Sequence, residues 1–575
     1  MSTPPPEAYL EILRKGITPF DRFVSRGDIK DQIDVPAPRG DLDARVMEAI
    51  DRISANGVSL SIPILGVAGS GKTHAYHALK DKERGLANPN WTTIYIPSPP
   101  SAIRILFHVY TCIVNEYPGF IDIVAKNLVD KFQGKFMGAD NSIDGLVKRA
   151  TSAYPLEFHD PIAMLIVYGT SDNKHKKTLA RRWIFGEGID EREFENLGIH
   201  SVIEEDNTGL AMIRLITEYL LIDGPEPGAP KRHKIMVFFF DEFESPFKIQ
   251  GAEAEAKFID TLNRIFKEVS HFLLIAAVLK DVWEKILGMF DDPFKARMQA
   301  LVELKPFTLD DVKSLIFASQ EQFWKANNMP VPQDMLFPLN EAVLKHIFER
   351  ARGNPRETIK LTRVLTEKIV SGELALDEIT GNGKPRDAAT QAALEEKATK
   401  EVDGLLDREA LVFDVNAANV IYAFVKGLQE LAFVHHPEDD PPLLQFEHKF
   451  ISIDAKEKTV GALLQLPKEN VAFDIPAIKT FDRSAGVAAY YCAKRLDEGI
   501  KAKRFNRAIM VIPTSTGGEK LQYILESNPA LSVLRIDQSQ AELIVKTALD
   551  PDMHISQIVY EMTNIVMKWD IKFEG

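Results

Sequence analysis

Gly66-Val67-Ala68-Gly69-Ser70-Gly71-Lys72-Thr73 is a complete G-x-x-x-x-G-K-T phosphate loop. The apolar residues 60–65 before it predict a short buried strand, and residues 74–80 after it predict the start of a helix. In a strand–loop–helix context the glycines let successive backbone N–H groups surround a phosphate, and the helix N-terminus adds its positive end. The stretch therefore predicts a nucleoside triphosphate site in an α/β domain with a parallel sheet.

The chemistry of this loop assigns roles to its side chains. We expect ATP and Mg²⁺ as ligands, with Lys72 reaching the β- and γ-phosphates and the Thr73 hydroxyl holding the metal. The other positions expected to contact the nucleotide are Gly66, Ala68, Gly69, Ser70, Gly71 and His74.

Composition narrows the class of protein. The chain has 575 residues, a net charge of −14 and two cysteines, which fits a reducing compartment and excludes a disulfide framework. The acidic balance argues against a surface coated with nucleic acid, although a local basic groove remains compatible with it. The N-terminus has no signal-peptide pattern and the longest apolar runs are too short to cross a bilayer, so we expect a cytoplasmic protein without membrane contact.

Changes in pattern along the chain predict its domains, with the fold class α/β. They are an N-terminal extension (1–45), a nucleotide-binding domain (46–305) with a helical insertion at about 101–230, a helical lid (306–370), a linker (371–409) and a separate C-terminal α/β domain (410–575).

A second acidic motif completes the predicted nucleotide site. Residues 236–240 form an apolar strand that ends in Asp241 and Glu242, the Walker B arrangement. Asp241 can hold Mg²⁺ and Glu242 can polarise the attacking water, so the pair favours hydrolysis over simple binding. The next strand ends at Leu279 without the Asn, Ser or Thr that usually senses the γ-phosphate, and the residue for that role is left open.

Two arginines are candidates for contact with the phosphates. Arg297 precedes a short strand, where an arginine finger would project into a neighbouring subunit, and the alternative is a surface arginine. Arg356 lies in the turn Gly353-Asn354-Pro355-Arg356 that opens a helix, from which it would sense the nucleotide in cis. The alternative for Arg356 is a solvated side chain on a capped helix.

Together these segments resemble the AAA+ superfamily, and most closely its origin-recognition and initiator-like branch. Residues 181–187, Arg-Arg-Trp-Ile-Phe-Gly-Glu, lie ahead of the Walker B strand and are similar to a segment of prokaryotic initiator-like ATPases associated with BREX-type phage-defence operons. The resemblance implies ATP hydrolysis at the interfaces of a homo-oligomer. It also implies action on DNA and a partner protein in a defence or transposition system.

The predicted insertion carries a basic segment. Thr73 and Asp241 stand much further apart than a bare strand–helix–strand path requires, which indicates roughly a hundred inserted residues. Residues 174–177, Arg181 and Arg182, with Trp183, could face nucleic acid through phosphate contacts. A solvated helix face or a subunit contact is the alternative.

The C-terminal domain resembles a degenerate restriction-endonuclease fold. Such nucleases end a strand with Glu-x-Lys, and here the matching triplet is Ala477-Ile478-Lys479, with alanine in place of a metal-binding acid. Asp474 and Glu447 could compensate. We interpret the domain as a non-cleaving module for DNA or partner contact, with basic residues at 494–495 and 501–507.

Three functions follow from these patterns. The first is an AAA+ ATPase that hydrolyses ATP at subunit interfaces and acts on DNA. The second is an ATP-gated scaffold or switch with slow turnover, and the third is an ATP-regulated nuclease that uses the C-terminal domain.

Overall fold

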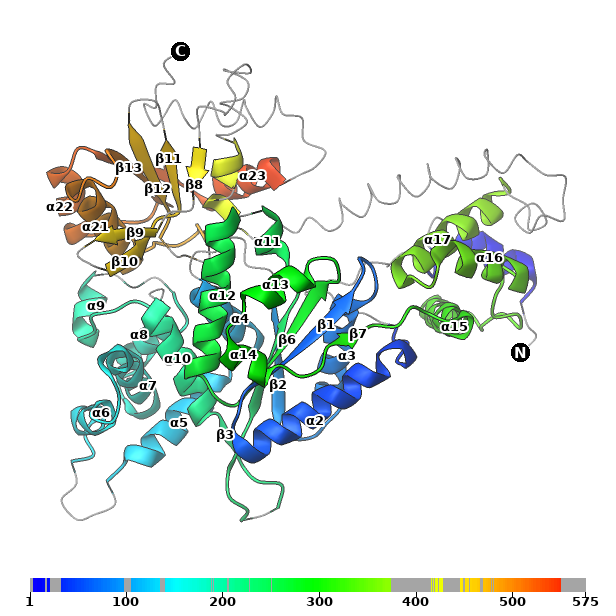
Figure 1. The fold of residues 1–575 in the computed structure, drawn as a ribbon, viewed down its shortest axis with the longest axis horizontal. Coiled ribbons are helices and arrows are strands. Elements are labelled where there is room, and N and C mark those ends of the chain that lie inside the picture. The colour runs from blue at the N-terminus through cyan, green and yellow to red at the C-terminus, as the bar shows by residue number, and fades with distance from the viewer. Residues whose placement is uncertain are drawn as a thin grey trace.

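Two α/β units make up the described part of the chain (Figure 1). The computed structural model describes residues 4–15, 18–20, 33–97, 105–134, 140–187, 189, 191–203, 206–226, 228–249, 251–373, 415–427 without 416, 418 and 422, 445–447, 450–453, 456–465, 469–476, 478 and 480–549. The first unit has a parallel sheet, a helical insertion and a helical lid, and the second has a separate mixed sheet, which confirms the predicted fold class. Among the described helices, none is long and apolar enough to span a membrane.

The first unit is built on a five-stranded parallel sheet in the order β2-β5-β6-β1-β7. The strands are β1 (Leu60–Gly66), β2 (Trp91–Ile96), β5 (Ile235–Phe240), β6 (Phe272–Leu279) and β7 (Val302–Glu303). The strands β5 and β6 are apolar throughout because helices cover both faces of the sheet. Since the strands are parallel, their carboxyl ends share one edge, and the phosphate loop after β1 and the acids after β5 meet there.

Alternating side chains of each strand enter two different cores. On β5, Val237 and Phe239 pack with α2 (Gly40–Asn56) and α3 (Lys72–Arg84). Phe238 and Phe240 pack on the opposite face, in the larger core formed with the insertion and the helices that follow β5. These helices are α11 (Ser245–Ile249), α12 (Gly251–Glu268), α13 (Trp283–Met289) and α14 (Asp292–Arg297).

The insertion between β2 and β5 is helical. Its elements are α4 (Ile105–Glu116), α5 (Phe120–Phe132), α6 (Ile143–Thr151), α7 (His159–Thr170), α8 (Lys174–Ile184), α9 (Glu191–Leu197) and α10 (Asp206–Tyr219), with a short ribbon of β3 (Leu221–Ile222) and β4 (Arg232–His233). The apolar faces of these helices join the core on one side of the sheet, so the insertion is continuous with the first unit.

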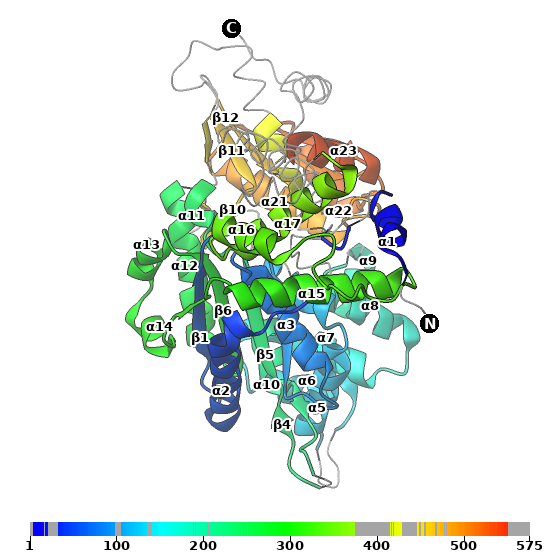
Figure 2. The same ribbon diagram turned by 90° about the vertical axis from the view of Figure 1, so that its right-hand side faces the viewer.

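The lid contains α15 (Leu309–Ala326), α16 (Glu341–Ala351) and α17 (Pro355–Ser371), and faces the viewer in Figure 2. Thr308 and Asp311 cap α15 reciprocally, each accepting the other's backbone N–H. The N-terminal helix α1 (Pro6–Leu13) packs on the lid, where the ring of Tyr9 meets Trp324 edge to face at 5.1 Å.

The C-terminal unit has a five-stranded mixed sheet in the order β14-β13-β12-β11-β8. Its elements are β8 (Gln445–Glu447), β11 (Ala462–Gln465), β12 (Asn470–Asp474), β13 (Arg507–Pro513), β14 (Leu531–Ile536), the hairpin β9 (Phe450–Ile453) and β10 (Lys456–Thr459), and helices α21 (Val487–Lys501), α22 (Glu519–Ser527) and α23 (Gln538–Leu549). The unit has its own apolar core. Residues 374–409 of the predicted linker lie outside the described residues.

Two histidines stack at the edge of the first sheet opposite the phosphate loop. The rings of His233 and His271 lie 3.5 Å apart between centroids, at 18° to each other. Burial, together with the neighbouring His233, lowers the pKa of His271 to about 4 from an ordinary value of 6.5. The folded chain therefore favours neutral His271, whereas the unfolded chain binds a proton below pH 6.5.

The lowered pKa of His271 predicts that the folded protein loses stability as the pH falls from about 6.5 toward about 4. Stability from His271 is fully present above about pH 6.5 and is lost as the pH falls toward about 4, on the order of 1 kcal/mol for a partly exposed ring. His271→Asn should flatten the dependence of the urea midpoint on pH in this window, because Asn tolerates the positive φ of 59°. His175→Asn, at an exposed position, is the control, and an equal slope in wild type and His271→Asn would contradict the prediction.

Candidate functional site

The phosphate loop has the backbone that its glycines require. β1 ends at Gly66 and α3 begins at Lys72, with Gly69 and Gly71 at φ of 74° and 92°. A Cβ on Gly66 would lie 2.2 Å from Ser70 Oγ, and one on Gly69 would lie 2.7 Å from Arg356 Cβ. The two glycines thus let the chain turn tightly and let the lid approach the loop.

Lys72 is held at the loop. Its Nζ donates to the backbone carbonyls of Gly66 and Val67, each at 3.1 Å. An ammonium group bonded to neutral carbonyls can exchange them for the stronger acceptor oxygens of a phosphate.

The two groups assigned to Mg²⁺ from the sequence come together at the carboxyl edge of the sheet. The Thr73 hydroxyl donates to Asp241 Oδ2 at 2.5 Å, and the Asp241 side chain is 4 % exposed. Glu242 follows with its side chain exposed at this edge and a left-handed φ of 48°. Hydroxyl and carboxylate oxygens are the donor set that Mg²⁺ prefers, so the residues present fit that ion.

Sequence reasoning missed Tyr95, the next-to-last residue of β2. Its hydroxyl donates to Asp241 Oδ2 at 3.0 Å, the same oxygen that Thr73 reaches. Burial and the nearby Asp241 carboxylate raise the pKa of Tyr95 far above its ordinary value, so the hydroxyl stays a donor. The only signal for this contact is the register of β2 against β5, which aligns Tyr95 with Phe239.

The lid contacts the phosphate loop directly. Asn354 Nδ2 donates to the Ala68 carbonyl at 2.8 Å, and the Arg356 backbone N–H donates to the Gly69 carbonyl at 3.3 Å. Arg356 Nε is buried and has no hydrogen-bond partner among the described residues, and the same holds for Ser70 Oγ. Orphaned polar atoms beside a phosphate loop fit an anionic ligand that would satisfy them.

His74 is joined to the segment that precedes α2. His74 Nε2 lies 2.9 Å from Asp34 Oδ1, and the Arg39 guanidinium also binds the Asp34 carboxylate. Burial alone would raise the pKa of Asp34, but the hydrogen bonds from His74 and Arg39 hold it well below its usual range. No local pattern relates Asp34 to His74, so the sequence analysis did not include Asp34 or Arg39.

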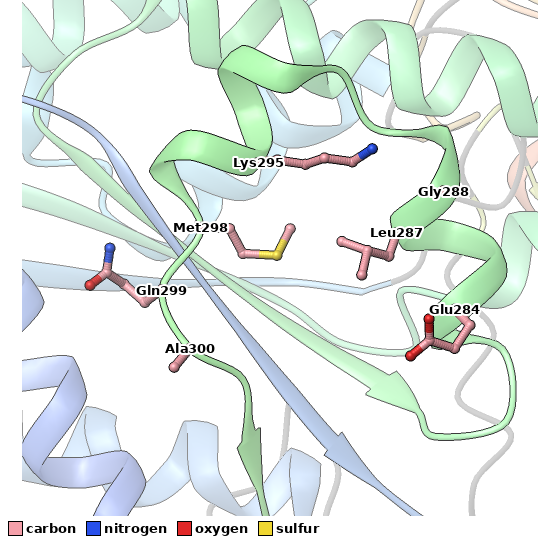
Figure 3. Close-up of a pocket in the computed structure, with 7 residues that line it drawn as sticks. All are labelled: Glu284, Leu287, Gly288, Lys295, Met298, Gln299 and Ala300. Atoms are coloured by element: carbon pink, nitrogen blue, oxygen red, sulfur yellow. The ribbon is translucent and has the colours of Figure 1, made fainter.

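Arg297 lies at the opposite edge of the sheet from its own phosphate loop. The next residue, Met298, bridges to Ser61 near the start of β1, and the Arg297 guanidinium donates to the carbonyl of Phe266. A groove of about 540 Å³ opens beside it between α13 and α14, with Leu287 and Met298 on facing sides (Figure 3).

Lys280, the residue that follows β6, is paired away from the site. Its ammonium group pairs with Glu303 at 2.7 Å, and its side chain is 59 % exposed. The residues of β6 before it, 276–278, are buried and apolar. The end of β6 therefore presents no hydroxyl or amide to a γ-phosphate.

The basic segment of the insertion divides into two parts. Arg182 binds both oxygens of Glu193, and Trp183 is 4 % exposed with its Nε1 donating to the Ser201 carbonyl at 3.0 Å. The Arg181 guanidinium lies over the Phe185 ring at 4.1 Å. Residues 174–177 in the first turn of α8 are exposed instead.

Asp474, the acid that could compensate in a nuclease site, is buried and forms an ion pair inside the C-terminal unit. Asp474 is 0 % exposed, and its Oδ2 accepts from Arg495 at 2.5 Å. A buried carboxylate paired with a guanidinium is poorly placed to bind a metal. Ala477 and Lys479 lie outside the described residues, and the Glu447 side chain is not described. Among the described residues no group of three or more His, Cys, Asp or Glu side chains could hold a metal ion.

The strand order, the phosphate loop, the acids after β5 and the lid on the loop form an α/β fold with an AAA+-like arrangement. No family model and no curated protein matches the chain. It is similar in structure to the ORC2 protein of Aeropyrum pernix in ADPNP–ADP complexes (10% identity, 96% of this chain and 98% of that chain, TM-score 0.31). It is also similar to the ORC1 protein of the same organism in complex with DNA (12%, 71% and 74%, TM-score 0.27).

Proposed function

We propose that the chain is an ATPase that binds and hydrolyses ATP with Mg²⁺ at interfaces between identical subunits and acts on DNA. The observation that carries the proposal is the bond between Thr73 and Asp241 at 2.5 Å, which joins the Walker A and Walker B segments beside Lys72. The orphaned Nε of Arg356 next to the loop supports an anionic ligand at the same place.

Each residue of the site has a task in this proposal. Lys72 binds the β- and γ-phosphates, Thr73 and Asp241 hold Mg²⁺, and Arg356 contacts the phosphates from the lid. Glu242 orients the attacking water and accepts its proton. When bound, Mg²⁺ neutralises charge on the phosphate oxygens. Tyr95 keeps the Asp241 carboxylate oriented toward Thr73.

Lys72→Ala tests the nucleotide site. We expect ATP affinity to fall by about 10- to 100-fold, because one charge-assisted contact to phosphate contributes about 1.5–3 kcal/mol. Titration calorimetry with a non-hydrolysable ATP analogue measures the change. Lys82→Ala, an exposed lysine of the same helix, should bind as wild type. Unchanged affinity in Lys72→Ala would refute the assignment of the loop.

The first turn of α8 supports contact with DNA. Lys174, Lys176 and Lys177 are exposed and form no ion pair with a described residue, and the ammonium group of Lys177 lies over the Tyr168 ring at 4.9 Å. Because the chain as a whole has a formal net charge of −14, this group of lysines is a local basic site on an acidic protein. Arg182 and Trp183 are left out of this surface because both have partners inside the insertion.

Replacing these three lysines with Ala should lower the salt dependence of DNA affinity. Each lost phosphate contact reduces the slope of log K against log salt by about 0.9. Fluorescence anisotropy with duplex DNA over a salt series gives the slope. The control replaces Lys126 and Lys148, exposed lysines on other insertion helices. If the slopes of wild type and the α8 variant coincide, DNA does not bind at α8.

A specific observation favours the ATP-gated scaffold as the second candidate. The end of β6 lacks a polar sensor and Lys280 pairs with Glu303, so γ-phosphate sensing is incomplete within the subunit. Turnover measured with and without DNA separates the two candidates, because a scaffold would hydrolyse slowly in both. The nuclease has less support because Asp474 is paired with Arg495. The defence or transposition setting stays a prediction from residues 181–187.

A further inference from the structure

The segment that follows α8 contacts the C-terminal unit. The Val487 backbone N–H donates to the Ile189 carbonyl at 2.6 Å, and the Tyr491 hydroxyl donates to the His200 carbonyl at 2.9 Å. The rings of Phe194 and Tyr491 meet edge to face at 6.1 Å. Figure 1 shows α9 beside the C-terminal unit.

The backbones approach closely at one point. Gly486 has a φ of 52°, and a Cβ there would lie 2.1 Å from the Ile189 carbonyl oxygen. Ile189 and Val487 are each 4 % exposed. Glycine at position 486 is therefore required for the contact as well as for the start of α21.

Three ion pairs join the two sides of this contact, and the sign of the charge alternates along each side. They join Glu187 to Arg483 (3.9 Å), Arg192 to Glu519 (3.4 Å) and Glu195 to Lys520 (2.5 Å). The insertion thus presents negative, positive and negative charges to positive, negative and positive charges on the C-terminal unit. An alternating pattern of this kind fixes orientation and rejects other surfaces through like-charge repulsion.

The insertion holds this surface rigidly. The Tyr110 hydroxyl donates to the Ile184 carbonyl, and Gly186 turns the chain at a φ of 66° against Phe107. Arg182 and Trp183 stabilise the turn through Glu193 and Ser201. Arg182 and Trp183 thus stabilise the surface of the insertion from within and are not available for contact with a nucleic acid.

We propose that residues 186–187, 189 and 191–200 are a docking site for the C-terminal domain of the same chain, specified by the three crossing ion pairs. Buried apolar side chains, those of Ile189 and Val487, lie within the contact, and ion pairs form its exposed rim, where Arg192 and Glu519 are 86 % and 90 % exposed. Docking is therefore sensitive to salt and to charge reversal. Through this contact the insertion carries the C-terminal domain.

The test reverses the charges on one side and then on both, in the full chain. The first variant carries Glu187→Lys, Arg192→Glu and Glu195→Lys, and the second adds Arg483→Glu, Glu519→Lys and Lys520→Glu. Hydrogen exchange of the peptides that contain Val487 and Tyr491 reports docking. A carbodiimide cross-link between positions 195 and 520 reports contact, and mixing with ¹⁵N-labelled chain distinguishes links within and between chains. Glu341→Lys on the lid matches the net change of charge in the first variant.

We expect exchange of these peptides to rise about tenfold or more in the first variant and to return to within about twofold of wild type in the second. The cross-link should form within single chains in wild type and in the second variant, and Glu341→Lys should behave as wild type. Unchanged exchange in the first variant, no recovery in the second, or cross-links only between chains would each overturn the proposal.

Discussion

Glu242→Gln is expected to lower steady-state ATP hydrolysis by about 100- to 10,000-fold while ATP affinity stays within about threefold of wild type. The amide has nearly the shape of the carboxylate but cannot accept a proton from water. Glu242 lies one residue after Asp241, exposed at the edge where Thr73 and Asp241 meet. Phosphate release and nucleotide binding, measured on the same preparation, separate loss of chemistry from loss of binding.

The matched control is Glu48→Gln, an exposed carboxylate on α2, which should hydrolyse ATP as wild type does. Asp241→Asn should differ from both, because it weakens the assigned metal position and lowers nucleotide affinity in Mg²⁺ more than in its absence. Hydrolysis near the wild-type rate in Glu242→Gln would show that another group activates the water.

The parts of the site that are formed by short contiguous motifs could be predicted from the sequence. The phosphate loop needs glycines at fixed spacing, and the strand that ends in Asp241 must be apolar because the sheet is covered on both faces. Both segments lie at the carboxyl edge of the sheet, as parallel strands require. The Gly-Asn-Pro-Arg turn could be predicted for the same reason, since it carries its own helix start and contacts the loop through Asn354.

The partners that come from distant segments could not be predicted. Tyr95 reaches Asp241 only because β2 pairs with β5 in one register, and a shift by one residue would turn its side chain to the other face. Asp34 reaches His74 through the path of the chain before α2, which no periodicity encodes. The role of Trp183 could not be predicted either. A segment rich in arginine and aromatic residues has the same composition whether it binds nucleic acid or supports a contact between domains, and here Trp183 donates to the Ser201 carbonyl.

Arg297→Ala is expected to lower hydrolysis by about 1000-fold or more, if Arg297 completes the site of a neighbouring subunit. It cannot act in its own subunit. Met298 bridges to Ser61, and the phosphate loop begins at the other end of β1, roughly 15–20 Å away at about 3.3 Å per residue. That is farther than an arginine side chain extends. In a neighbour, its guanidinium would exchange the Phe266 carbonyl for a phosphate oxygen, a stronger acceptor.

A mixing experiment separates this role from a structural one. Arg297→Ala keeps its own Glu242, and Glu242→Gln keeps its own Arg297, so neither protein alone has a complete site. In an equal mixture half of the sites keep Glu242, and half of those face a neighbour with Arg297, so activity should reach about a quarter of the wild-type rate. If Arg297 only stabilised the fold through Phe266, mixing would restore nothing. Activity retained by Arg297→Ala alone would remove the arginine from the site.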